Sequence, residues 1–101
     1  MTRDELEQEL ETEMRSKTAE LQRLTGTKIG QSIYRMFPRY GAIETLRRVV
    51  KRGTGSEGFQ RLREIDRLDL SVEHTAIDLR YRGIVDDATL ARAEASLSAI
   101  E

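Results

Sequence analysis

The sequence has few of the residues that fix a structure through covalent or metal bonds. It contains no cysteine, which excludes disulfide bonds and thiolate metal sites. It has one proline, no tryptophan and only five aromatic residues, so its core must consist mainly of Leu, Ile, Val and Ala. No apolar run approaches the ~18 residues of a membrane span, and the acidic first segment is unlike a signal peptide. We therefore expect a soluble, cytoplasmic protein without membrane contacts.

Charged residues are abundant instead, at 35% of the chain, beside 38% hydrophobic residues. A chain of 101 residues has the length of a single domain. Many Glu, Arg, Leu and Ala residues with few β-branched runs favour helix over strand. The sequence therefore predicts an all-α fold, a compact bundle of five or six short helices with a longer N-terminal amphipathic helix. We expect one domain, residues 1–101, with that helix at 1–24 and a helical core at 27–101.

The net charge of −1 conceals an uneven distribution. The segment 1–24 has a net charge of −3, the segment 25–55 has +6, and the segment 56–101 has −4. A basic centre between two acidic ends suggests that the centre contacts an acidic partner or nucleic acid.

The first helix has a clear start and a narrow apolar stripe. Thr2 with Glu5 forms a capping box, and Gly26 is a suitable C-terminal stop. A stripe on a long polar helix can pack on its own domain or pair with a partner helix. The stripe consists of Leu6, Leu10, Met14, Leu21 and Leu24.

A basic surface is predicted on the next two helices. We expect a helix from Thr27 that ends at Pro38, a turn through Gly41, and a third helix over 42–52. Together they can approximate a helix-turn-helix with a cationic face. The candidate anion or nucleic-acid patch is Arg35, Arg39, Arg47, Arg48, Lys51 and Arg52. Against this, the isoelectric point is about 5.9, and the segment 42–52 has no base-reading Asn or Gln. The same face can simply be hydrated, or dock on the acidic first helix of its own or a neighbouring chain.

The second half of the chain contains the run RLDLSVE, from Arg67 to Glu73. We interpret Leu68 and Leu70 as buried core residues and Ser71 as the N-cap of a helix that Gly83 closes. Ser56 caps the helix before this run. Asp86 or Asp87 caps the last helix, whose apolar positions are Leu90, Ala93, Leu97 and Ile100.

Several runs resemble a group of small bacterial helical proteins of about this length, which also occur as modules at the ends of larger bacterial proteins. The shared features are an aromatic residue, a Gly-Ala turn before a Leu-rich helix, a Ser-x-Gly-Phe segment, and an Arg-Leu-Asp-Leu-Ser/Thr-x-Glu run. Here they are Phe37, Gly41-Ala42, Ser56–Phe59 and Arg67–Glu73. The group has a Leu-Phe pair where this chain has Ile84-Val85. The resemblance implies a helical fold and a bacterial setting, and it implies no catalytic activity.

Residues for catalysis or metal binding form no convincing pattern. The single histidine, His74, lies beside Glu73 near a helix start, where it is more simply solvated. Paired carboxylates can hold Mg²⁺, and the sequence has an acidic cluster at Glu64, Asp66, Asp69 and Glu73. This cluster lacks the fixed residue spacing of a calcium-binding loop. The only glycine-rich loop, at 53–55, has no phosphate-binding lysine. We therefore expect no enzyme activity, no cofactor and no small-molecule ligand.

Two functions are left open by the sequence. The first is a non-enzymatic protein-interaction or accessory module, which self-associates or binds a protein partner through the stripe on the first helix. The alternative is a nucleic-acid-binding module that uses the basic helix at 42–52.

Overall fold

The computed structural model describes residues 1–99 of the chain, and the predicted all-α fold is confirmed. These residues form five α-helices and three short 3-10 helices, with no β-strand among them. The α-helices are α1 (Arg3–Thr25), α2 (Gln31–Arg52), α3 (Glu57–Glu64), α4 (Val72–Ala76) and α5 (Asp87–Ser98). The 3-10 helices are η1 (Gly53–Gly55), η2 (Leu68–Leu70) and η3 (Leu79–Tyr81).

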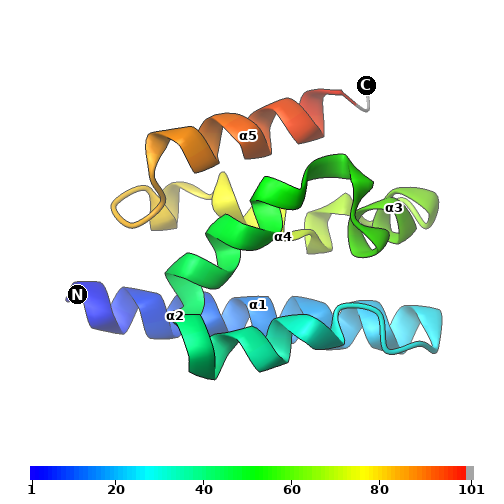
Figure 1. Ribbon diagram of the computed structural model, residues 1–101, viewed down its shortest axis with the longest axis horizontal. Coiled ribbons are helices and arrows are strands. Elements are labelled where there is room, and N and C mark those ends of the chain that lie inside the picture. Colours follow the sequence, from blue (N-terminus) through cyan, green and yellow to red (C-terminus); the bar gives the residue numbers. More distant parts are fainter. Residues whose placement is uncertain (100–101) are drawn as a thin grey trace.

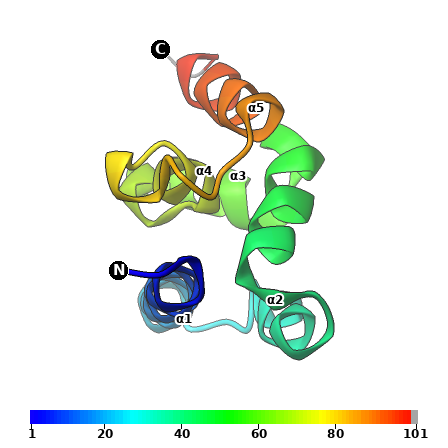
Figure 2. The ribbon, with the colours of Figure 1, turned by 90° about the vertical axis from the view of Figure 1, so that its left-hand side faces the viewer.

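Helix α2 connects the two ends of the bundle. It starts alongside α1, then changes direction and runs towards α5 (Figure 1). The view from the side shows α1 and α5 at opposite ends, with α4 and its flanking segments between them (Figure 2). The radius of gyration is 12.6 Å, close to the roughly 13 Å expected for a compact domain of this length.

Helix α1 begins and ends as its sequence predicts. The Thr2 hydroxyl accepts a hydrogen bond from the Glu5 backbone N–H, and the Glu5 carboxylate accepts one from the Thr2 N–H. This capping box satisfies two N–H groups that have no partner within the helix. At the other end Gly26 adopts the left-handed conformation, with φ of 65°, that a C-terminal stop requires.

The prediction that Pro38 ends a helix is wrong. Pro38 lies inside α2, and the helix continues through Arg39 and Tyr40. The break is at Gly41, where φ is 79° and ψ is 168°. Proline removes one backbone hydrogen bond but keeps a φ that suits a helix, whereas the φ of Gly41 lies outside the right-handed region. The chain therefore changes direction at Gly41, as predicted, and α2 consists of a first arm (31–40) and a second arm (42–52), which matches the predicted helix over 42–52.

The helix that begins within RLDLSVE, after Ser71, is shorter than predicted. Ser71 does cap it, since its hydroxyl accepts a hydrogen bond from the His74 N–H, but α4 ends at Ala76. Asp78 then adopts an extended conformation and accepts a hydrogen bond from the Arg80 N–H, which starts η3 instead. As a result Leu79, which the predicted helix from Ser71 to Gly83 would have included, lies outside α4 and is 75% exposed.

The core lies between α1, both arms of α2, α4 with the segment that follows it, and α5. Its residues are Leu10, Met14, Ile33, Met36, Phe37, Ala42, Leu46, Val49, Val50, Ala76, Tyr81, Ile84, Val85 and Ala93. Leu68 and Leu70 are only half-buried, so their interpretation as core residues is wrong. Asp86 caps α5 as predicted. Ile100 lies outside the described residues.

Candidate functional site

The apolar stripe of α1 packs mainly against the rest of its own chain. Leu10 and Met14 are fully buried, Leu21 is 5% exposed, and Leu6 packs half-buried against the core. Only Leu24, at 39%, presents a substantial surface to solvent. Of the two roles predicted for the stripe, the structure therefore favours packing within the domain, and little of the stripe remains available to a partner helix.

The break at Gly41 brings the predicted basic residues together. A concavity of about 580 Å³ lies on α2, and all six predicted cations line it. Arg35 and Arg39 come from the first arm, and the other four cations come from the second arm. The complete lining is Ser32, Arg35, Met36, Arg39, Tyr40, Arg47, Arg48, Lys51 and Arg52. We call this surface the basic concavity.

One carboxylate neutralises part of this charge. Glu44 forms ion pairs with Arg47 at 2.7 Å and with Arg48 at 2.8 Å. Hydrogen bonds from Arg47, and then from Arg48, lower the pKa of Glu44 to about 2. Among residues 1–99, the other four cations of the basic concavity form no ion pair. Most of its positive charge is therefore free to meet an external anion.

Tyr40 organises the arginines at the break. The Arg48 guanidinium lies 3.9 Å from the centre of the Tyr40 ring, and that of Arg39 lies 5.3 Å away. A cation over an aromatic face is attracted to the ring. Tyr40 thus holds one arginine from each arm, a role that sequence analysis missed because it depends on how the arms are placed.

Helix α1 supports the start of the second arm. After a break, the first N–H groups of the new helical segment have no partner within it. The Glu7 Oε2 atom accepts a hydrogen bond of 2.9 Å from the Ile43 N–H, across 36 positions of sequence. A side chain at Gly41 would meet this carboxylate, because a Cβ there would lie 3.1 Å from Glu7 Oε2. The shape of the basic concavity therefore depends on Gly41 and on a residue of α1.

The other candidate residues do not come together. Glu64, Asp66, Asp69 and His74 are exposed, whereas Glu73 is buried. Within residues 1–99, no three His, Cys, Asp or Glu side chains are grouped as metal ligands. In the same range, no helix combines the length and the apolar character needed to cross a membrane.

Comparisons of this chain with protein-family models, with curated proteins and with solved structures found no match. The resemblance to small bacterial helical proteins therefore rests on the sequence runs alone and stays a prediction.

Proposed function

We propose that this protein is a non-enzymatic helical binding module whose basic concavity binds the phosphate backbone of nucleic acid. The observation that carries the proposal is the gathering of six cations from the two arms of α2 around one concavity. Within residues 1–99, Glu44 is the one acid that forms ion pairs with them, so the surface keeps a strong positive charge.

Arginine suits this role because its planar guanidinium presents several N–H donors to phosphate oxygens. Five of the six cations are arginines. The acidic segments 1–24 and 56–101 repel nucleic acid elsewhere, which confines binding to the basic concavity.

We expect binding with little sequence preference. The two arms of α2 join at one residue, without the three- or four-residue turn of a helix-turn-helix. The second arm also has no Asn or Gln to read an adenine edge. Contacts to phosphate position a protein on nucleic acid but carry no sequence information.

Fluorescence anisotropy with labelled mixed-sequence DNA and RNA, at about 50 mM salt, tests this proposal. We expect binding by the unaltered protein and loss of binding in the double variant Lys51→Glu, Arg52→Glu. The matched control is Arg82→Glu, Arg92→Glu, which changes the net charge equally at two exposed residues outside the basic concavity. An absence of binding at this salt concentration, or an equal loss in both double variants, would contradict the proposal.

Self-association is a second candidate, because α1 carries a complementary acidic surface. Glu5, Glu9 and Glu13 line an open groove with Lys17 and Arg80. Glu13 already forms ion pairs with Lys17 at 3.4 Å and Arg80 at 3.3 Å, whereas Glu5 and Glu9 form none among residues 1–99. This groove of one copy can face the basic concavity of another. Light scattering without nucleic acid tests the candidate: the mass should exceed that of a monomer at low salt and return to it in Lys51→Glu, Arg52→Glu.

A further inference from the structure

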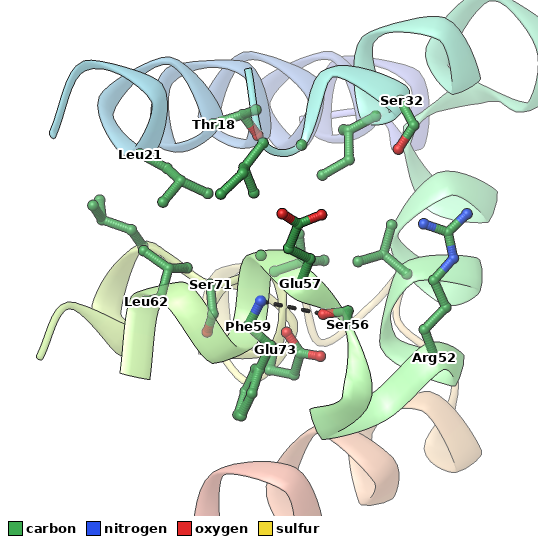
Figure 3. Close-up of a pocket in the computed structure, with 17 residues that line it drawn as sticks. Thr18, Leu21, Ser32, Arg52, Ser56, Glu57, Phe59, Leu62, Ser71 and Glu73 are labelled. Atoms are coloured by element: carbon green, nitrogen blue, oxygen red, sulfur yellow. Dashed lines mark hydrogen bonds between the residues drawn. The ribbon is translucent and has the colours of Figure 1, made fainter. Parts of the chain in front are cut away.

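A second, more enclosed cavity lies inside the bundle and has a volume of about 200 Å³ (Figure 3). Residues from α1, α2, α3 and the junction of η2 with α4 surround it. Ser32 and Arg52 line both this cavity and the basic concavity, so the two are neighbours on α2. We call it the inner cavity.

One wall of the inner cavity contains a buried carboxylate with unused hydrogen-bonding capacity. Glu73 is 2% exposed, and its Oε2 atom has no hydrogen-bond partner among residues 1–99. Burial without a partner raises the pKa of Glu73 to about 7. Leaving a buried acceptor unsatisfied costs free energy, so the fold gains from any donor that reaches this carboxylate.

Three of the four hydroxyl groups that line the inner cavity have partners within the protein, whereas that of Ser32 forms no hydrogen bond among residues 1–99. Thr18 donates to the Met14 carbonyl, and Ser71 donates to the Leu68 carbonyl. The Ser56 hydroxyl accepts a hydrogen bond from the Phe59 N–H, drawn as the dashed line in Figure 3. Among residues 1–99, the Glu73 carboxylate is therefore the buried polar group of this lining that lacks a hydrogen-bond partner, whereas Ser32, Arg52 and Glu57 line the inner cavity as exposed residues.

The remaining lining sets the size and character of a ligand. Much of it is apolar: Leu21, Ile29, Ile33, Val49, Phe59, Leu62, Leu70 and Val72. A dry cavity of about 150 Å³ is known to hold benzene, so about 200 Å³ accommodates a molecule of similar size. An apolar body suits these side chains, and a cationic N–H donor suits the carboxylate.

We propose that the inner cavity binds a small organic cation, a primary ammonium group on a short apolar body, with Glu73 as its counter-charge. The ammonium group donates to the Glu73 carboxylate, while the apolar body packs against the aliphatic side chains and Phe59. This site is separate in chemistry from the phosphate-binding proposal, and neither depends on the other.

Amide NMR spectra of the labelled protein test the proposal in titrations with n-butylammonium, n-butanol and butyrate. A ligand of about five or six non-hydrogen atoms binds weakly, so each compound is added up to about 50 mM. We expect n-butylammonium to shift the amides of Gly30, Gly58 and Val72, which line the inner cavity. It should bind about tenfold or more tightly than n-butanol, since a hydrogen bond to a charged group is worth at least that ratio.

The decisive variant is Glu73→Gln, which keeps the size of the side chain and removes its charge. We expect it to lose the preference for n-butylammonium over n-butanol, while Glu57→Gln, at an exposed lining residue, keeps it. The same spectra show whether each variant is folded. Equal shifts with all three compounds, an unchanged preference in Glu73→Gln, or no shifts at all would overturn the proposal, the last because the cavity then holds only water.

Discussion

Replacing Glu73 by glutamine should make the stability of this protein less dependent on pH. Glu73 is 2% exposed, and its pKa is raised from 4.5 to about 7 because burial disfavours the charged form. The folded state therefore holds the proton of this carboxyl more tightly than the unfolded state does. Its contribution to the free energy of unfolding is complete below pH 4.5 and is lost as the pH rises through about 7.

The size of this effect follows from the two pKa values. A difference between 4.5 and about 7 corresponds to about 3 kcal/mol, at about 1.4 kcal/mol for each pH unit. Glutamine does not titrate, so the stability of Glu73→Gln relative to the unaltered protein should rise by that amount between about pH 4 and pH 8. Carboxylates with lowered pKa values, such as Glu44 at about 2, lose their contribution to the free energy of unfolding at lower pH. They are present in both proteins, so their contributions cancel in the comparison.

Urea denaturation followed by circular dichroism, at four pH values across this range, measures the difference. Glu57→Gln is the matched control, because it removes an exposed carboxylate from the same cavity lining and should leave the pH dependence unchanged. Parallel curves for the unaltered protein and Glu73→Gln would refute the reasoning, since they would mean that Glu73 is solvated or paired.

Four further substitutions test the packing. Gly41→Ala should lower the free energy of unfolding by about 1–3 kcal/mol in urea denaturation, because φ of 79° is strained for alanine and its Cβ would lie 3.1 Å from Glu7 Oε2. Phe59→Ala should cost about 3–5 kcal/mol, and half-buried Leu70→Ala clearly less; equal losses would contradict the burial described above. Leu24→Gln, at a residue that is 39% exposed, should change the midpoint of thermal unfolding by little, within about 0.5 kcal/mol of stability.

Local signals in the sequence predicted four of the five α-helix starts among residues 1–99. Thr27 was expected to start the second helix, but α2 begins at Gln31, after Gly30, which provides no side-chain cap. Four predicted N-caps are present: Thr2, Ser56, Ser71 and Asp86. An N-cap is a local feature, because its side-chain oxygen accepts a hydrogen bond from a backbone N–H only a few residues later in the chain. The turn through Gly41 was predicted correctly, but the helix before it was expected to end at Pro38 and instead continues to Tyr40. Whether a helix continues past a proline depends on packing that the sequence does not display.

In the candidate sites, too, the sequence predicted the local features but not those that depend on tertiary packing. The charge pattern identified all six cations of the basic concavity, but its shape depends on Gly41 and on Glu7, a residue 36 positions before its hydrogen-bond partner. From the sequence we predicted no small-molecule ligand, because the sequence alone shows Glu73 only as an acidic residue in the first turn of a helix. Its burial comes from tertiary packing around the inner cavity, which no local pattern reports.

The salt dependence of nucleic-acid binding tests the central proposal most directly. Four cations of the basic concavity have no ion pair among residues 1–99, and each phosphate contact that they make releases counterions. We expect the logarithm of the association constant for double-stranded DNA to fall with the logarithm of salt concentration with a slope of about −4. Lys51→Gln should reduce the magnitude of this slope by about one. A flat dependence, or a slope that Lys51→Gln leaves unchanged, would contradict binding at the basic concavity.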